Sequence, residues 1–98
     1  MQNNINTDNL TVVHEKDNNR FTMAINGEIA KVVYQLRDHK MYLTYSEVPF
    51  KLRGKGYGKE LVERSFEQLT QEGYKAVAVC SYIKAVARRS EKWNSIIE

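Results

Sequence analysis

Hydrophobic and polar residues alternate through the first half of the chain, in segments separated by polar turns. The alternating segments are residues 10–15, 20–25, 29–36 and 41–48. A period of two is typical of β-strands with one buried face. The turns between them read KDNN, NG and RDHK, and Asn26-Gly27 indicates a hairpin because both residues tolerate positive φ. This half is therefore predicted to form a four-strand antiparallel meander.

In the fourth segment, strict alternation divides the side chains between the two faces of the sheet. The expected sets are Met41, Leu43, Tyr45 and Glu47 on one face, and Tyr42, Thr44, Ser46 and Val48 on the other. Pro49 follows directly and has no N–H to donate to a strand ladder. The strand is therefore expected to end there.

The second half of the chain changes to a helical period. Residues 59–72 carry an apolar stripe at helical spacing, formed by Leu61, Val62, Ser65, Phe66 and Leu69. Gly73 is expected to end this helix as a left-handed cap. Residues 74–82, YKAVAVCSY, are short and largely apolar, which is typical of a buried strand. A final helix is predicted over residues 84–97, with Val86, Trp93 and Ile97 facing inward.

These elements predict an α/β fold of the α+β type. It has a four-strand antiparallel meander, a helix, a fifth strand and a C-terminal helix. A strand–helix–strand connection usually makes its two strands parallel, so the fifth strand is expected to pair in parallel with the fourth. A length of 98 residues with 42% hydrophobic residues fits one domain with a single core. Residues 1–9 are expected to form a flexible tail, and residues 10–98 the domain.

Several functional classes are not expected from the composition. The apolar runs are too short for a membrane span and the start MQNNINTDN lacks the blocks of a secretory signal, so a cytoplasmic protein with no membrane partner is predicted. Cys80 is the single cysteine, and His14 and His39 stand far apart. No disulfide and no metal site are therefore predicted, and the histidines are assigned no function.

Positive charge is concentrated in the second half of the chain. Residues 50–98 contain ten Lys/Arg against six Asp/Glu, and residues 1–49 contain five against six. This asymmetry suggests an anionic partner, although a chance distribution of solvated lysines fits the charge alone equally well. Glu60, Glu63 and Glu67 interrupt the basic residues, so no nucleic-acid partner is predicted.

Three of the five glycines stand at alternate positions before the predicted helix, at Gly54, Gly56 and Gly58. Glycines there allow several N–H groups to point to one spot, where the first turn of the helix adds partial positive charge. The cations around this spot are Arg53, Lys55 and Lys59. A phosphate-binding loop is predicted, and the alternative is a tight turn with no ligand. The glycine spacing fits neither a P-loop nor a GxGxxG dinucleotide site.

The pattern Arg53-x-x-Gly56-x-Gly58 resembles the acyl-CoA signature Q/R-x-x-G-x-G/A of the GNAT superfamily of N-acetyltransferases. The phrase VPFKLRGKGYG, followed by CSYI at residues 80–83, is similar to a very short single-domain GNAT family with VP…RGxGxG…CSY motifs. The resemblance covers residues 47–89 and agrees with the four-strand beginning. Members of that short family tend to show a basic-His-Pro-Glu-Tyr run at the place where this chain reads RRSEKW. The role of the last helix is therefore left open.

The resemblance implies a GNAT-like transferase that moves an acetyl group from acetyl-CoA to an amine of a small molecule or a protein. The pyrophosphate of coenzyme A would lie on the amides of the glycine loop, and the pantetheine between the fourth and fifth strands. The implied cofactor-binding residues are Val48, Arg53, Gly54, Lys55, Gly56, Tyr57, Gly58 and Lys59. The alternative is a non-catalytic acyl-CoA-binding module, since so short a chain leaves little material for an acceptor pocket.

Acetyl transfer needs a neutral amine, a polarised carbonyl and a proton for the leaving thiolate. Glu47 is the candidate base, and backbone amides near Val48 are candidates to hold the carbonyl oxygen. By the resemblance, Cys80 lies near the acyl group, and its thiolate is a candidate acceptor of the acetyl group before the amine. Lys84 and the start of the last helix are expected to lower the pKa of Cys80. Tyr82 is the candidate acid.

Each of these three side chains also has an ordinary structural interpretation. Glu47 fits a solvated carboxylate at a strand end, Cys80 a small buried hydrophobic residue, and Tyr82 an aromatic core residue. The sequence does not decide between these interpretations and the catalytic ones.

Overall fold

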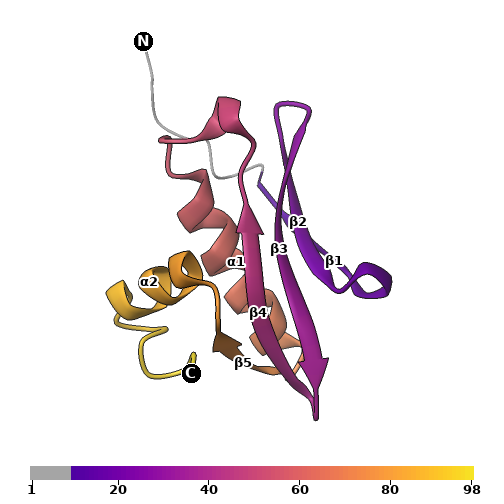
Figure 1. Ribbon diagram of the computed structural model, residues 1–98, viewed down its shortest axis with the longest axis vertical. Helices are drawn as coiled ribbons and strands as arrows, with labels where there is room; N and C mark the ends of the chain where they lie inside the picture. Colours follow the sequence, from indigo (N-terminus) through magenta and orange to yellow (C-terminus); the bar gives the residue numbers. More distant parts are fainter. Residues whose placement is uncertain (1–9) are drawn as a thin grey trace.

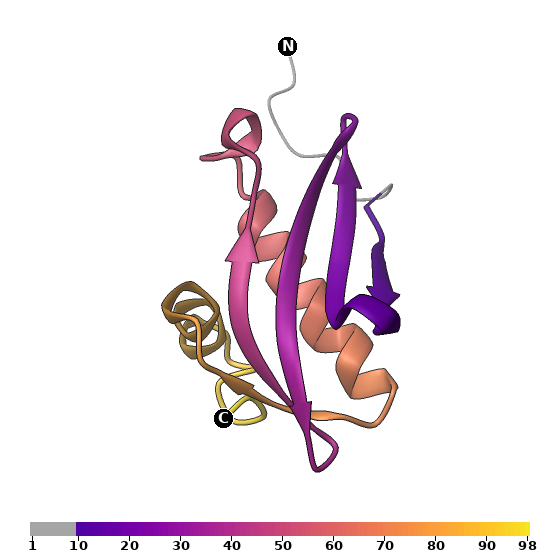
Figure 2. The ribbon, with the colours of Figure 1, turned by 45° about the vertical axis from the view of Figure 1, so that its right-hand side comes forward.

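The structure is a computed structural model that describes residues 10–98. A five-stranded sheet, in the order β1-β2-β3-β4-β5, forms one layer, and α1 and α2 pack against one of its faces (Figures 1 and 2). The elements are β1 (Val12–Glu15), β2 (Arg20–Ile25), β3 (Glu28–Arg37), β4 (Lys40–Glu47), α1 (Tyr57–Gln71), β5 (Lys75–Ala78) and α2 (Ser81–Arg89), with short 3-10 turns at Lys16–Asn18 and Phe50–Leu52.

The topology confirms the predicted fold class. Strands β1 to β4 pair antiparallel in sequence order, and β5 pairs in parallel with β4 after the crossover through α1. Asn26 and Gly27 form the predicted hairpin turn with positive φ at both residues. Gly73, at φ 89°, ends α1 as predicted. The predicted tail, residues 1–9, lies outside the described residues.

A single hydrophobic core joins the sheet to both helices. The predicted α1 stripe is buried in full, and its Phe66 ring lies 5.3 Å from the Trp93 ring, measured between centroids. Phe21, Met23 and Leu43 face this stripe from the sheet and are inaccessible to solvent. Burying one such side chain contributes roughly 1.5–3 kcal/mol. In the described part of the chain, no helix is long and apolar enough to cross a membrane.

A β-bulge in β4 corrects the predicted faces of that strand. Val33 pairs with Tyr45 and Tyr34 pairs with Leu43, which leaves Thr44 without a partner on β3. One extra residue on one strand reverses the alternation beyond it. Tyr45 and Glu47 therefore lie on the helix-free face, opposite to Met41 and Leu43, and the prediction that all four share a face was wrong.

The prediction that the fifth strand extends over residues 74–82 was also wrong at its C-terminal end. β5 stops at Ala78, and the N–H groups of Val79 and Cys80 both donate to the carbonyl of Leu43, at 3.0 and 2.9 Å. Two successive donors to one acceptor cannot continue a regular ladder. The chain turns away from β4 at this point, and Cys80 becomes the N-cap of α2.

The C-terminal helix is shorter than predicted and begins earlier. α2 ends at Arg89, because Ser90 adopts an extended conformation and its hydroxyl accepts a hydrogen bond from the Trp93 N–H at 3.1 Å. Trp93 and Ile97 are buried as predicted, although they lie in the turns after the helix. The backbone of Glu98 bonds to Ala76 and Ala78 and so covers the outer edge of β5.

Candidate functional site

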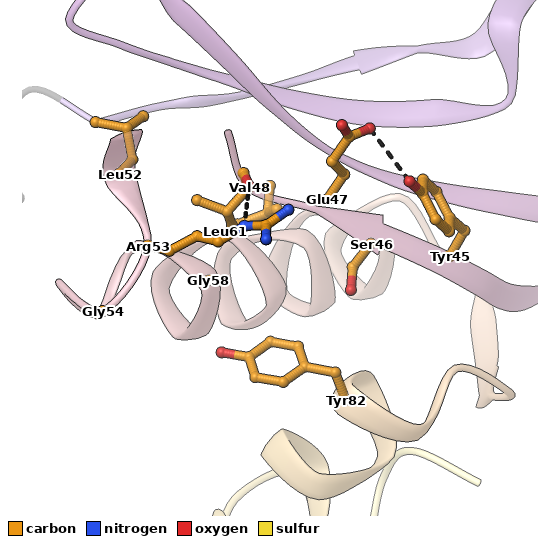
Figure 3. A pocket seen from close by; sticks show the side chains of 11 residues that line it. Tyr45, Ser46, Glu47, Val48, Leu52, Arg53, Gly54, Gly58, Leu61 and Tyr82 are labelled. Atoms are coloured by element: carbon orange, nitrogen blue, oxygen red, sulfur yellow. Dashed lines mark hydrogen bonds between the residues drawn. The ribbon is translucent and has the colours of Figure 1, made fainter. Parts of the chain in front are cut away.

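β4 and β5 separate beyond Leu43, and a cavity of about 450 Å³ opens beside the unpaired part of β4 (Figure 3). This volume lies within the range of small-molecule binding sites, roughly 300–1,000 Å³. The wall is formed by the end of β4, the glycine loop, the start of α1 and one residue of α2. The lining residues are Tyr45, Ser46, Glu47, Val48, Leu52, Arg53, Gly54, Gly56, Gly58, Leu61 and Tyr82.

The glycine loop leaves the first turn of α1 open to a ligand. Gly56 is the N-cap residue, at φ 87°, and no side chain caps the helix. The amides at the start of a helix have no acceptor within it, so here they lack both an intrahelical and a side-chain partner. Those amides belong to Tyr57, Gly58 and Lys59. Positive φ at Gly54 and Gly56 requires glycine, because a Cβ disfavours this backbone conformation.

Arg53 folds back toward β4 from the same loop. Its Nε donates a hydrogen bond to the Val48 carbonyl at 3.0 Å (Figure 3). Its guanidinium also lies over the exposed Phe50 ring, 5.7 Å from the ring centroid. Arg53 therefore lines the cavity. Lys55, Tyr57 and Lys59, which were predicted with it, lie outside this lining.

Gly58 is part of α1 and not of the preceding loop, since the helix begins at Tyr57. Its bare Cα allows a close approach of α2. A Cβ at this position would lie 2.7 Å from the Tyr82 hydroxyl oxygen, which is shorter than any ordinary contact. Gly58 therefore lets the Tyr82 ring rest against the first turn of α1.

Tyr82 lies on α2 and not on the fifth strand. Its side chain points into the cavity, and the residue is 45% exposed, so the interpretation as a core aromatic residue was wrong (Figure 3). Partial burial raises the pKa of its phenol, and the positive charge of Arg89 offsets part of that rise. The hydroxyl is therefore protonated at neutral pH and can donate a proton.

Cys80 lies next to the cavity wall without being one of its lining residues. Its Sγ is 3.6 Å from the hydroxyl of Ser46, a residue that does line the cavity. Partial burial raises the pKa of the thiol. Hydrogen bonds from the Ile83 amide, from Ser46 and from the Tyr82 amide outweigh burial, so the pKa lies below its ordinary value of 9.0. The start of α2 has the predicted effect, whereas Lys84 is not among the causes.

Glu47 extends to the other side of β4. Figure 3 shows Ser46 pointing toward Tyr82, while Glu47 and Tyr45 point away from it. The Glu47 carboxylate lies 3.6 Å from Lys31 Nζ and accepts a hydrogen bond from the Tyr45 hydroxyl at 3.3 Å. The negative charge of Glu47 is the main cause that raises the pKa of Tyr45. The candidate base therefore faces the helix-free side of the sheet.

Sequence reasoning missed Ser46 and Tyr45 as site residues. Ser46 connects the cavity to the Cys80 thiol, and Tyr45 holds the Glu47 carboxylate. Their positions depend on the bulge at Thr44, which no pattern in the sequence indicates. Leu52 and Leu61 add the apolar part of the wall. Leu61 was predicted only as part of the buried helix stripe, and Leu52 was assigned no role.

Comparison with known proteins gives a consistent family assignment. Residues 20–96 match the sequence model of a family described as GCN5-related N-acetyl-transferase. Protein NATD1 of Gallus gallus is 27% identical over 84 residues, which are 83% of this chain and 76% of NATD1. An uncharacterized N-acetyltransferase of Schizosaccharomyces pombe is 40% identical over 55 residues, covering 56% of this chain and 22% of that protein.

A solved structure shares the fold. The solution structure of a GCN5-like protein from Staphylococcus aureus superposes with a TM-score of 0.67 and 22% identity, covering 93% of this chain and 90% of the other.

Proposed function

The chain belongs to the GCN5-related N-acetyltransferase family, and on that premise we propose that it transfers an acetyl group from acetyl-CoA to an amine. Family and fold support the acetyltransferase activity and the acyl donor. The observation that carries the proposal is the uncapped start of α1, which lies beside the cavity where β4 and β5 separate. An anionic ligand with a long, narrow arm suits this combination of amides and cleft.

The amides at the start of α1 are suited to hold the pyrophosphate of coenzyme A. The helix end provides partial positive charge, worth about 0.3–1 kcal/mol for an exposed anion and more when it is partly buried. Arg53 can add charge-assisted hydrogen bonds from the loop. Gly54 and Gly56 leave the backbone accessible because they carry no side chain. The pantetheine arm then extends through the cavity toward Ser46, with the Val48 amide available for the carbonyl oxygen.

Two chemical routes are compatible with the side chains around the cavity. In the direct route, Glu47 takes the proton of the amine, and the amine nitrogen attacks the thioester carbonyl. Because Glu47 faces the helix-free side, the amine approaches from that side of β4. The C–S bond breaks, and Tyr82 donates its proton to the departing thiolate of coenzyme A.

In the second route, the Cys80 thiolate attacks the thioester first. A thioester forms on Cys80, free coenzyme A leaves after protonation by Tyr82, and the amine then takes the acetyl group from Cys80. The lowered pKa of Cys80 supports this route, because it increases the thiolate fraction at neutral pH. Contact with Ser46 orients the sulfur along the cavity wall.

A binding module without turnover is the second candidate function. The position of Glu47 favours it, because the carboxylate is already paired with Lys31 and lies across β4 from Tyr82. Such a module would hold acyl-CoA on the same loop without transferring the acetyl group.

One assay separates these possibilities. The purified protein is incubated with acetyl-CoA and, in turn, a polyamine, an aminoglycoside and a lysine peptide, and the release of free coenzyme A thiol is followed. We expect release above the rate without amine for at least one acceptor class. Binding of acetyl-CoA without release for every amine would favour the module. With an active acceptor, surviving turnover in Cys80→Ala would exclude an obligatory acetyl-Cys80.

A further inference from the structure

The Glu47 carboxylate has one oxygen in contact with its neighbours and one oxygen open. Its Oε1 lies 3.6 Å from Lys31 Nζ. The same oxygen accepts the hydrogen bond from the Tyr45 hydroxyl at 3.3 Å (Figure 3). Within residues 10–98, Oε2 makes no hydrogen bond or ion pair. The half-buried carboxylate can therefore bind one ammonium group at Oε2 while Lys31 and Tyr45 stay in place.

The surroundings of Glu47 offer no second carboxylate for a further positive charge. In the described part of the chain, the strands carry two other carboxylates, Glu15 and Glu28, and each is paired with a cation. Residues 48–59 run from the end of β4 through the glycine loop into α1, and they contain four cations and no acidic residue. A second ammonium group on the acceptor would therefore meet positive charge and no free carboxylate.

Apolar side chains lie exposed around the same carboxylate. Tyr45 is 49% exposed on the face that it shares with Glu47. Phe50, in the 3-10 turn after β4, is 82% exposed. Ile29 lies on the same face of β3, two residues before the strand partner of Glu47, and is 54% exposed. We call Ile29, Tyr45 and Phe50 the apolar rim. Three such side chains around one carboxylate favour a binding surface over a chance distribution.

Contacts of the 3-10 turn hold Phe50 beside the cavity. The centroid of its ring lies 5.7 Å from the guanidinium carbon of Arg53, which lines the cavity. Lys51 Nζ lies 4.0 Å from a carboxylate at the start of β3 and so joins the turn to the sheet. Arg53 also acts on Tyr45: the charge of Glu47 raises the pKa of the Tyr45 phenol, and the charge of Arg53 offsets part of that rise. Both rings therefore lie near Arg53 at the edge of the cavity.

We propose that the acetyl acceptor is an aromatic monoamine, a small molecule with one positive charge on an aromatic body. Its ammonium group binds Glu47 Oε2, and its ring lies on the apolar rim. This inference rests on the proposed function, because it assumes that Glu47 receives the amine. A polyamine or an aminoglycoside carries several positive charges, which this surface does not balance.

The test compares amines that differ in charge and in the presence of a ring. At saturating acetyl-CoA, the release of coenzyme A thiol gives kcat/KM for 2-phenylethylamine, hexylamine, 1,5-diaminopentane and a lysine peptide. Hexylamine and 1,5-diaminopentane are matched in length and differ by a methyl or an ammonium group at the far end. The variants are Phe50→Ala and, as the matched control, Val13→Ala. Val13 is 55% exposed on the same face, but it lies on β1 at the opposite edge of the sheet.

The highest kcat/KM is expected for 2-phenylethylamine, and hexylamine should exceed 1,5-diaminopentane about tenfold, the effect of about one unbalanced charge. Phe50→Ala should lower kcat/KM for 2-phenylethylamine about fivefold, mainly through KM, and lower it less than about twofold for 1,5-diaminopentane, which has no ring. Val13→Ala should stay within about twofold of wild type for every amine. In both variants, calorimetry should give a dissociation constant for acetyl-CoA within about threefold of wild type.

A kcat/KM for 1,5-diaminopentane or the lysine peptide at or above that for 2-phenylethylamine would overturn this assignment and leave the proposed function standing. Equal losses in Phe50→Ala and Val13→Ala would do the same, because the apolar rim would then have no specific effect. If acetyl-CoA binds and none of the four amines is acetylated, the proposed transfer and this assignment fall together.

Discussion

Gly58 and Tyr82 form a contact whose function can be tested at the residue scale. Gly58→Ala places a Cβ 2.7 Å from the Tyr82 hydroxyl oxygen. Alanine is otherwise favourable inside a helix, by up to about 1 kcal/mol over glycine, so the fold should be retained. We expect the Tyr82 hydroxyl to be displaced and the rate of acetyl transfer to fall about as far as in Tyr82→Phe.

The double variant Gly58→Ala/Tyr82→Phe provides the control for this prediction. It lacks the hydroxyl that clashes, so its rate should match that of Tyr82→Phe alone. A double variant much slower than either single variant would show that Gly58 acts independently of Tyr82. Rates are compared at saturating acetyl-CoA, with the thermal midpoint as a check on folding.

Cys80 is the only cysteine, so its ionisation can be followed without interference. The pKa of its thiol is held below the ordinary 9.0 by hydrogen bonds that outweigh burial, among them one from Ser46. The rate of alkylation by iodoacetamide should therefore reach half of its maximum below pH 9. In Ser46→Ala, the midpoint should move to higher pH. A wild-type midpoint at or above 9, or no shift in Ser46→Ala, would contradict this account.

At the scale of elements, the C-terminal end of α1 is joined to the sheet by a polar cluster. The Glu72 carboxylate accepts a hydrogen bond from His14 Nδ1 at 2.9 Å, and His14 Nε2 lies 2.6 Å from the Tyr34 hydroxyl. Since a carboxylate only accepts, the Nδ1 proton belongs to His14, and in the neutral ring Nε2 accepts from Tyr34. His14 also stacks on Phe21, at 4.3 Å between centroids.

This cluster predicts a pH-dependent contribution to stability. Burial raises the pKa of Glu72, but hydrogen bonds from Gln68 and His14 and the charge of Lys16 outweigh it, so the pKa lies below its ordinary value of 4.5. A carboxyl group with a lowered folded-state pKa stabilises the fold above the unfolded pKa, and the effect is lost as pH falls through the folded one.

Glu72→Gln should therefore lower the free energy of unfolding by about 1–3 kcal/mol at pH 7, in urea titrations. The difference from wild type should shrink as the pH falls below about 4.5. Glu67→Gln is the control, because Glu67 is exposed on the same helix and pairs only with exposed Lys92, at 3.4 Å. A pH-independent difference, or an equal loss in Glu67→Gln, would show that the Glu72 charge is not responsible.

The sequence predicted the elements well where pattern and turn chemistry agreed. The hairpin at Asn26-Gly27, the buried stripe of α1 and its cap at Gly73 follow from local rules.

The ends of β4 and β5 could not be predicted from local rules. Thr44 is a good strand residue, so nothing local marks it as a bulge. The residues CSY at 80–82 favour a strand by propensity. In the structure they begin a helix, because Ile83 is buried in the core and the Lys84 N–H donates to the Cys80 carbonyl at 2.9 Å.

At the scale of the whole molecule, the cavity follows from the way the sheet ends. The glycine loop was predicted as a phosphate-binding loop from residue types alone, with a tight turn that binds no ligand as the alternative. The opening of the cavity was not predicted from the residues, since it depends on β5 leaving β4 at Ala78 and on α2 bringing Tyr82 across the opening. Such long-range arrangements have no signal at the level of short motifs.

Binding of acetyl-CoA at the start of α1 is the central claim, and a calorimetric titration of the purified protein at moderate salt tests it most directly. We expect saturable binding with a dissociation constant of about 1 μM, roughly −8 kcal/mol, and much weaker binding of adenosine diphosphate. Gly56→Val should abolish the binding, because its side chain blocks the amides. No heat and no thermal stabilisation by acetyl-CoA in the same samples would contradict the account.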